Sequence, residues 1–375
     1  MKLQAKVILL ISPQSWGNMY IAKHHYAIEL AKANNIVYFL NPPQKWKLKS
    51  KVEIVPIANI KNLLVINHDL FFPYQIKFKW IGLFHFLMRF HTRKILKTIN
   101  KKIDIVWNFD LGNYYPFNFF PEDAFKIFMP IDEPTNKQAI LAANGCQIIF
   151  SVSHEILHKY HHHKVPKHFI HHGLSDEFKD SPKLNFVKDN KIRVGLSGNW
   201  LRTDVDHVTL LKIIKENRDI IFEFWGSYQQ KDSNIGGGSD KEVQSFIQEL
   251  KSSINVIMHG AVHPKNLAQE FQRMDAFLVC YDIEKDQSKG TNYHKIMEYL
   301  STGKVIISNN ITTYQNINLI EMTNSRQNND DLPQLFKTVI NNLEIYNNIS
   351  NSQKRNEFAY NNSYKSKIQV IQNKL

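Results

Sequence analysis

The sequence predicts an α/β protein with two doubly wound, Rossmann-like domains that face a central cleft. Short apolar runs alternate with helical segments along most of the chain, which is typical of parallel strands buried on both faces. The same rhythm occurs on both sides of a polar, proline-containing stretch at 176–190, which we expect to be the linker. Acidic residues and glycines follow several predicted strands, at the edge where such sheets bind ligands.

Length and composition are those of a globular protein. The 375 residues, 43% hydrophobic and 22% charged, suffice for two domains and are too apolar for disorder. Cys146 and Cys280 lie far apart in apolar surroundings, so we expect reduced thiols and a cytoplasmic protein. The apolar run at 6–12 lacks a small-residue cleavage site and predicts a strand rather than a signal peptide. No apolar run approaches the ~20 residues that span a bilayer.

The first half of the chain contains the predicted sheet of the first domain. The expected strands are 6–12, 36–40, 52–57, 63–67, 103–109, 125–130 and 147–151, and the expected helices are 22–33 and 135–144. Trp16, Lys23, His24 and His25 follow the first strand, and Asp110 and Asp132 follow two later strands. These side chains are therefore candidates for the ligand-binding edge. A packed tryptophan and surface histidines are the alternative interpretation.

The net charge of +13 favours an anionic partner, which could be nucleic acid, anionic lipid or a phosphorylated substrate. The tract 71–102 is basic and aromatic and contains no Asp or Glu. Its basic residues are Lys77, Lys79, Arg89, Arg93, Lys94, Lys97, Lys101 and Lys102. Such a segment is typical of contact with an anionic membrane, but a core helix with a basic outer face and a nucleic-acid surface are alternatives.

Eight histidines between His154 and His172 raise the question of a metal site. His154 and His158 have the i, i+4 spacing of helical ligands. No cysteine or carboxylate pattern of a known metal site accompanies them, so we expect no metal.

The second half repeats the alternation. The expected strands are 191–197, 219–225, 254–258, 275–280 and 304–308, and the expected helices are 206–217 and 264–273. Glycines follow two of these strands, at Gly198 and Gly226, where the backbone can approach a ligand closely. The run 236–238 lacks the context of a phosphate-binding motif, so we expect a surface loop there.

The stretch 286–310 predicts a loop, a helix, a glycine turn and a strand, with Thr291 or Asn292 capping the helix. An apolar stripe at helical spacing consists of Ile296, Tyr299 and Leu300. Lys295 and Glu298 lie on the neighbouring face, near a helix N-terminus. This arrangement suits a nucleotide, with Lys295 at the phosphates and Glu298 at the ribose hydroxyls. An ordinary solvent-facing Lys/Glu pair is the alternative.

The pattern N-x-x-K-x-x-E-Y-L-x-x-G-K-x-[VI] at 292–306 resembles the nucleotide-sugar signature of GT-B glycosyltransferases, particularly group-1, family-4-like enzymes. The order of the surrounding elements also fits, best from 191 to 310. The resemblance implies a hexosyltransferase-like enzyme that moves a sugar from a nucleotide diphosphate sugar to an acceptor hydroxyl, with no cofactor or metal. The implied domains are 1–180 on the acceptor side, 190–352 for the donor, and a C-terminal helix at 353–375 that returns to the first domain.

The resemblance also implies roles for individual residues. Arg202 and Lys295 would stabilise the departing diphosphate, and Glu298 would bind the ribose. Asp110 or Asp132 would be the base if the enzyme inverts configuration. The other expected substrate-binding residues are Trp16, His24, Gly198, Asn199, Gly226, Ser227, His259, Val262, His263 and Asn292.

The chain departs from the family pattern at Gly290, where family-4 enzymes with the E-x7-E pattern carry an acidic residue. Glu284 or Asp286 could substitute for it. His172 also replaces the Asn that usually follows the last strand of the first domain. A sugar-nucleotide epimerase of the same fold and a non-catalytic nucleotide-sugar-binding protein are therefore alternative functions.

Many GT-B glycosyltransferases act on membrane-bound acceptors. The resemblance therefore makes membrane contact the preferred interpretation of 71–102. The expected acceptor is lipid-linked or a saccharide, in bacterial cell-surface polysaccharide or glycolipid synthesis. We expect a cytoplasmic protein, peripheral on the inner face of the membrane. No nucleic-acid partner is expected, since no binding motif accompanies the charge.

Overall fold

The computed structural model describes residues 1–17, 19–179, 190–229, 240–286 and 288–375. The chain divides into two compact units. The first consists of Met1–Trp16, Ile21–His171 and Lys367–Leu375, and the second of Gly17–Tyr20 and His172–Ser366. Most of the expected linker, at 180–189, and the glycine run at 236–238 lie outside the described residues.

The first unit contains an eight-stranded sheet in the order β3-β4-β2-β1-β5-β6-β7-β8. Its strands are β1 (Val7–Ile11), β2 (Ile36–Leu40), β3 (Val52–Pro56), β4 (Leu63–His68), β5 (Ile105–Asn108), β6 (Phe125–Phe128), β7 (Ile148–Ser151) and β8 (Lys167–Phe169). All neighbours are parallel except the hairpin β3–β4. Apolar runs such as Val7–Ile11 form central strands because both faces of a parallel sheet are covered.

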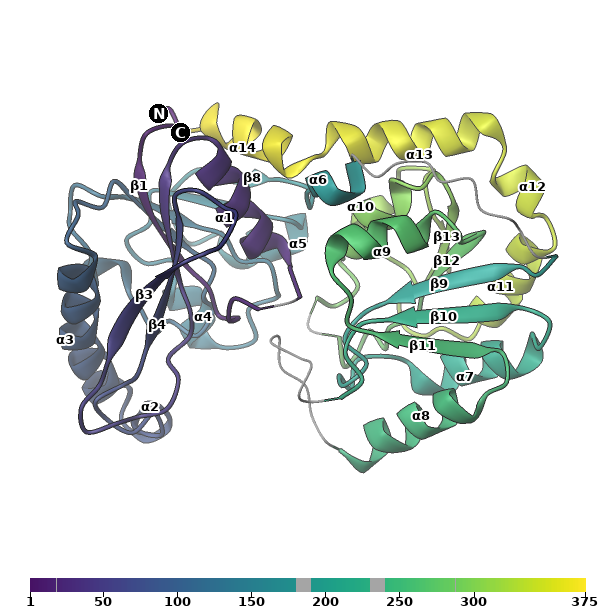
Figure 1. Ribbon diagram of the computed structural model, residues 1–375, viewed down its shortest axis with the longest axis horizontal. Coiled ribbons are helices and arrows are strands. Elements are labelled where there is room, and N and C mark those ends of the chain that lie inside the picture. Colours follow the sequence, from purple (N-terminus) through teal and green to yellow (C-terminus); the bar gives the residue numbers. More distant parts are fainter. Residues whose placement is uncertain (18, 180–189, 230–239, 287) are drawn as a thin grey trace. The chain divides into compact units, whose positions relative to one another are not determined.

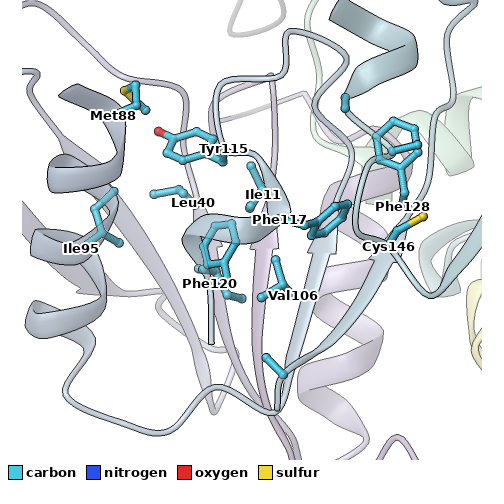
Figure 2. Close-up of a cluster of buried hydrophobic side chains, with 14 of the residues drawn as sticks. Ile11, Leu40, Met88, Ile95, Val106, Tyr115, Phe117, Phe120, Phe128 and Cys146 are labelled. Atoms are coloured by element: carbon cyan, nitrogen blue, oxygen red, sulfur yellow. The ribbon is translucent and has the colours of Figure 1, made fainter. Parts of the chain in front are cut away.

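Helices pack on this sheet. They are α1 (Ala22–Lys32), α2 (Ile76–Lys79), α3 (Ile81–Ile99), α4 (Lys137–Leu141) and α5 (His154–Lys159), with a short 3-10 turn at Phe117–Phe119. In α3 the buried residues Phe84, Met88, His91, Thr92, Ile95 and Ile99 recur at helical spacing. Figure 2 shows Met88 and Ile95 of this helix beside Leu40 of β2, with Phe117 and Phe120 closing the core.

The outer face of α3 carries a stripe at the same spacing, formed by Leu83, Phe86, Phe90, Arg93 and Lys97. The apolar side chains occupy its N-terminal part and the basic ones its C-terminal part. Phe86 is 58% exposed and Phe90 is 46% exposed. The tract 71–102 is therefore a core helix on one face and an exposed aromatic and basic surface on the other.

The second unit contains a six-stranded parallel sheet in the order β11-β10-β9-β12-β13-β14 (Figure 1). The strands are β9 (Arg193–Ser197), β10 (Ile221–Trp225), β11 (Val256–Gly260), β12 (Ala276–Val279), β13 (Val305–Ser308) and β14 (Glu321–Met322). The two parallel α/β sheets confirm the predicted fold class.

The helices of the second unit are α6 (Asp176–Lys179), α7 (His207–Glu216), α8 (Lys241–Ser252), α9 (Pro264–Phe271), α10 (Lys295–Leu300), α11 (Leu332–Ile340), α12 (Leu343–Tyr346) and α13 (Ile349–Asn361), with a 3-10 turn at Thr312–Tyr314. Helix α14 (Tyr364–Gln372) begins in the second unit. The end of α14 belongs to the first unit, where the Leu3 N–H donates to Gln372 Oε1. None of the described helices is both long and apolar enough to cross a membrane.

The predicted helix cap in the second unit was wrong. Helix α10 begins at Lys295 with His294 as its N-cap, and no side chain caps it. Thr291 instead donates its hydroxyl to the Ser288 carbonyl. The reason is that the preceding loop is organised around the buried Asp286 carboxylate, which accepts hydrogen bonds from the backbone of Ser288 and Gly290.

Candidate active site

The buried ammonium of Lys295 marks the point in the second sheet where the strand order reverses. Strands β9 and β12 are neighbours there, and the chain leaves them in opposite directions across the sheet, an arrangement that forms a ligand crevice in doubly wound folds. Lys295 is 6% exposed, and its Nζ donates to the carbonyl of Ser197 and to the Tyr281 hydroxyl at 2.7 Å. Ser197 ends β9 and Tyr281 follows β12, so two strands fix one cation.

Burial lowers the pKa of Lys295 to about 8, because an ammonium loses its hydration inside the protein. The negative charge of Asp204 opposes this effect more than any other group. With this pKa about nine-tenths of the side chain is still charged at pH 7. Because the Lys295 side chain is buried, the solvent-facing alternative for this residue is wrong.

Glycines bring three strand ends into backbone contact beside this cation. The Gly198 N–H donates to the Trp225 carbonyl at 3.0 Å, and the Gly226 N–H donates to the Gly260 carbonyl at 2.7 Å. Gly226 has a φ of +112°, and a Cβ there would lie 1.7 Å from the Gly198 oxygen. At Gly198 a Cβ would lie 3.1 Å from Lys295 Nζ. A side chain at Gly226 would therefore collide with the backbone of Gly198, and one at Gly198 would crowd the Lys295 ammonium.

Arg202 and Asp204 form an ion pair in the loop after β9. The Arg202 Nε donates to Asp204 Oδ2 at 2.7 Å, and its Nη2 contacts the same oxygen. Asp204 is 3% exposed, and burial raises the pKa of its carboxyl group. Asn199 lies in the same loop, where its Oδ1 accepts from the Leu201 N–H at 3.2 Å. Arg202, the second predicted phosphate ligand, is therefore held by a buried carboxylate.

Glu298 lies one turn beyond Lys295 on α10 and is partly exposed. Its surroundings raise the pKa of the carboxyl group, chiefly through burial. No hydrogen bond to this carboxyl group is found in the described part of the chain. Asn292 is 4% exposed and lies before the helix rather than on its face.

Of the other expected substrate-binding residues, Gly226 and Ser227 follow β10, His259 lies near the end of β11, and Val262 and His263 follow β11. His259 Nε2 lies 2.7 Å from Glu223 Oε2, and the His259 ring stacks on Trp225 with centroids 4.8 Å apart. The side chain of His263 caps α9 by accepting from the Lys265 N–H, and Val262 packs against the hydrophobic core of the second unit. Ser227 Oγ donates to Met19 Sδ at 3.0 Å.

In the first unit, Trp16 and His24 pack together. Their ring centroids are 5.3 Å apart, and both ring nitrogens of His24 face backbone groups, at Ile21 and Ser15. Burial lowers the pKa of His24 to about 3, so the ring is neutral. These contacts give both residues a structural part in the loop after β1, and their binding role stays a prediction.

Asp110 and Asp132 differ in what their carboxylates contact. Asp110 is 2% exposed, and its two oxygens accept from the N–H groups of Gly112 at 2.7 Å and Tyr114 at 2.8 Å. Asp132 is partly exposed, and no side-chain hydrogen bond to it is found among the described residues. Burial lowers the pKa of Lys23, and the charges of the nearby Asp132 and Asp110 oppose this lowering in part. Of the two candidate bases, Asp110 therefore has both oxygens bonded, whereas Asp132 shows no partner in the part of the chain that the structure describes.

The histidine-rich segment forms ring stacks. His154 stacks on Phe169 with centroids 4.5 Å apart, and His158 stacks on His161 at 5.4 Å. Within the described ranges, no group of three or more His, Cys, Asp or Glu side chains could hold a metal ion.

The structure brings Gly198, Arg202 and Lys295 together at one point in the second unit, with Glu298 on the same helix as Lys295. It places Trp16, His24, Asp110 and Asp132 in the first unit. Asp204 and Tyr281 were missed by the sequence reasoning. Nothing in the local sequence distinguishes them, because their partners Arg202 and Lys295 are brought to them by the fold.

No protein-family model and no curated protein matches the chain. Among solved structures, sucrose-phosphate synthase from Thermosynechococcus elongatus is similar over 98% of both chains, with a TM-score of 0.71 and 10% identity. Anabaena HepE in complex with UDP and glucose has a TM-score of 0.63 and 11% identity over 98% of this chain and 99% of its own. The lipopolysaccharide outer core galactosyltransferase WaaB has a TM-score of 0.61 and 14% identity over the same shares.

These similar structures are GT-B glycosyltransferases and match nearly the whole chain, so this chain has the GT-B fold. The prediction of that fold from the signature at 292–306 is confirmed. At these identities the likeness establishes the fold, and the activity is argued from the site.

Proposed function

We propose that the chain is a glycosyltransferase that moves a sugar from a nucleotide diphosphate sugar to an acceptor hydroxyl. The observation that carries this proposal is the buried Lys295 ammonium at the reversal point of the second sheet. Negative charge grows on the diphosphate as the glycosidic bond breaks, and a preorganised cation in a dry site stabilises that charge strongly. Arg202 would supply a second cation once the diphosphate competes with Asp204 for it.

Glu298 would accept hydrogen bonds from the ribose hydroxyls, because its carboxyl group has no protein partner among the described residues. Gly198, Asn199 and Asn292 would contact the diphosphate and sugar through backbone and amide groups. The nucleoside base would lie against the end of β11 and the loops after β10 and β11, at Gly226, Ser227, His259, Val262 and His263. Because Anabaena HepE binds UDP and glucose, UDP is a suitable first probe for this chain.

A thermal-shift screen tests the donor assignment. Wild-type protein is heated with UDP, GDP, ADP and dTDP and with the sugar nucleotides of each, since a ligand that binds the native state raises the melting temperature. We expect one nucleotide family to stabilise the protein, and Glu298→Gln to reduce that effect. No stabilisation by any of them at millimolar concentration would contradict the proposal.

We further propose that the acceptor is lipid-linked or a saccharide in cell-surface glycan synthesis. The enzyme would be cytoplasmic and would bind the anionic inner face of the membrane. The segment 45–102 contains thirteen Lys and Arg residues against Glu53 and Asp69, and so accounts for most of the net charge of +13. Phe78 and Trp80, just before α3, are 74% and 62% exposed. Aromatic side chains flanked by basic ones favour the interface of anionic bilayers.

Vesicle co-sedimentation tests the membrane proposal with phosphatidylcholine vesicles that contain or lack phosphatidylglycerol. Each basic residue near an anionic surface contributes about 1 kcal/mol, so removing three should weaken binding about a hundredfold. The test variant changes three residues of α3 to Gln: Arg93, Lys94 and Lys97. The control variant changes three exposed residues of the second unit to Gln: Lys212, Lys215 and Lys241. Equal binding to both kinds of vesicle, or an equal loss in both variants, would contradict the proposal.

A further inference from the structure

The carboxylate of Asp204 has one oxygen in use and one without a partner. Oδ2 accepts from Arg202 Nε at 2.7 Å, whereas Oδ1 has no hydrogen-bond partner among the described residues. The residue is 3% exposed. Leaving a buried carboxylate oxygen without a donor is costly, so such an atom in a site needs an explanation.

The backbone holds this carboxylate beside the candidate phosphate cations. The Asp204 carbonyl accepts from the Asp282 N–H at 2.8 Å, and Val205 pairs with Tyr281, whose hydroxyl accepts from Lys295. Asp204 is also the charge that most favours the ionised form of Lys295. A carboxylate in this position repels a diphosphate, so its remaining oxygen must face a neutral part of the ligand that carries hydrogen-bond donors.

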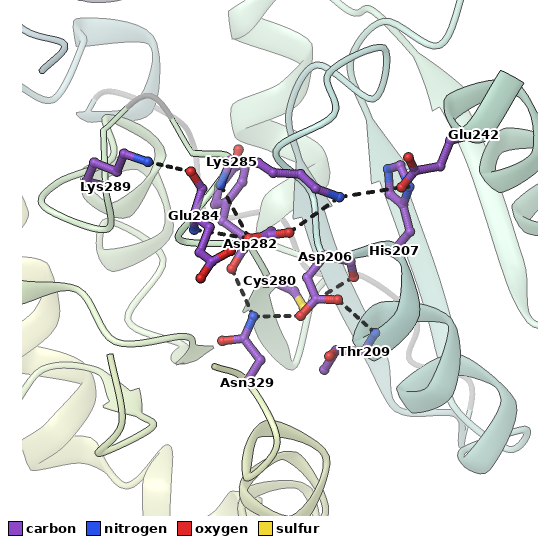
Figure 3. Close-up of polar contacts among 11 residues, drawn as sticks. Asp206, His207, Thr209, Glu242, Cys280, Asp282, Glu284, Lys285, Lys289 and Asn329 are labelled. Carbon is purple, nitrogen blue, oxygen red and sulfur yellow. Dashed lines mark hydrogen bonds and ion pairs between the residues drawn. The ribbon is translucent and has the colours of Figure 1, made fainter. Parts of the chain in front are cut away.

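The neighbouring carboxylates are already engaged. Figure 3 shows Asp206 accepting from the Thr209 N–H and from Asn329, while Asp282 contacts Lys285. Asp206 and Asp282 therefore have partners between α7 and the loop after β12 that do not involve the Asp204 carboxylate.

Neither of the two acids that could have replaced the family's acidic residue at Gly290 offers a buried carboxylate oxygen without a partner. Glu284 is exposed. The oxygens of Asp286 accept from the N–H groups of Ser288 and Gly290 and from the Tyr293 hydroxyl, at 3.1, 2.9 and 2.7 Å. Gly290 itself has a φ of +67°, which a side chain would strain.

We propose that Asp204 binds a hydroxyl group of the donor's sugar through Oδ1 and thereby takes over the sugar recognition that Gly290 cannot provide. A hydroxyl is a neutral donor that forms short hydrogen bonds to a carboxylate. A nucleotide sugar carries hydroxyls on its ribose, which we assign to Glu298, and on the transferred sugar, which remains for Asp204. Asp204 is then a specificity-determining residue that also holds Arg202. This inference rests on the proposed function.

The test compares affinities for a nucleoside diphosphate and its sugar nucleotide by calorimetry, using UDP with UDP-glucose and UDP-galactose, and GDP with GDP-mannose. In Asp204→Asn we expect the affinity for the sugar nucleotide, relative to that for the nucleotide alone, to fall about ten- to a hundredfold, the scale of one charge-assisted hydrogen bond. Asp204→Glu keeps the charge beside Arg202 but displaces the oxygens, so it should lower the same ratio and leave nucleotide binding close to that of the wild type.

The matched control is Asp282→Asn, which removes the same charge from the adjoining loop and should leave the ratio unchanged. Melting temperatures check that each variant is folded. An equal loss for nucleotide and sugar nucleotide in Asp204→Asn would mean that Asp204 only holds Arg202, and would overturn the inference. An effect seen only with magnesium would make Asp204 a cation ligand and would also overturn it. If the wild type binds none of these nucleotides, the proposed function itself fails.

Discussion

Replacing Lys295 with Met should separate the function of this side chain from its effect on stability. The two side chains are similar in length, but Met has no charge to desolvate. Burial lowers the pKa of Lys295 from 10.5 to about 8, which corresponds to a cost of about 3 kcal/mol for holding the ammonium in the fold at neutral pH. The variant loses that cost, and it also leaves the Ser197 carbonyl and the Tyr281 hydroxyl without their donor.

Losing those two hydrogen bonds costs about 1–2 kcal/mol. We therefore expect Lys295→Met to be more stable than the wild type by about 1–2 kcal/mol at pH 7. The pH dependence provides a second check. The folded pKa lies below the unfolded one, so wild-type stability should rise as the pH increases from about 8 to about 10.5, and the variant should lack this rise.

Binding should show the opposite pattern. Wild-type affinity for the nucleoside diphosphate should fall about tenfold per pH unit above pH 8, as the ammonium loses its proton. Lys295→Met should bind the nucleoside diphosphate weakly at every pH. Any pH effect from titration of the nucleotide itself is the same for both proteins and cancels in their comparison. Denaturant unfolding and calorimetry at pH 7 and pH 9 measure both effects. A variant that is several kcal/mol less stable, or that binds as well as the wild type, would refute this reasoning.

Three other perturbations probe the site and the fold. Glu298→Gln should weaken nucleoside diphosphate binding by about 1–3 kcal/mol in calorimetry, and unchanged affinity would remove its role at the ribose. Gly226→Ala should lower the free energy of unfolding by several kcal/mol, since its Cβ would meet the Gly198 oxygen, and a neutral result in denaturant melts would contradict the backbone contact. Stability should fall as the pH drops from about 6.5 towards 4, because His68 and His91 are buried with pKa values lowered to about 4 and about 3. His91→Phe should reduce the pH dependence of the melting temperature in this range, and an unchanged dependence would contradict the role given to His91.

The alternation of strands and helices was predictable because buried parallel strands are continuous apolar runs. Ile36–Leu40, for example, is a run of five apolar residues between polar turns, a length typical of a buried strand. Helix α8 was not predicted, although Val243, Phe246, Ile247 and Leu250 recur at helical spacing and are buried. That periodicity was available in the sequence.

The site was predictable only in part. The spacing of Lys295 and Glu298 placed them correctly on one helix, but it could not show that Lys295 is buried, because Ser197 and Tyr281 come from distant segments. The start of α10 was predicted too early, since Asp286 organises the loop before it through contacts that local propensity does not express. Asp204 belongs to no motif, and only its unused oxygen in the folded chain draws attention to it.

Sugar transfer is the direct test of the central claim. The chain is incubated with radiolabelled nucleotide sugars and with a lipid extract or saccharide acceptors, and the labelled product is separated and counted. We expect label in an acceptor with one nucleotide sugar, strongly reduced transfer in Lys295→Met, and full transfer in Glu270→Gln, a control on α9 whose carboxylate pairs with Arg273. Donor that binds but is never transferred, or donor that is epimerised without an acceptor, would contradict the account.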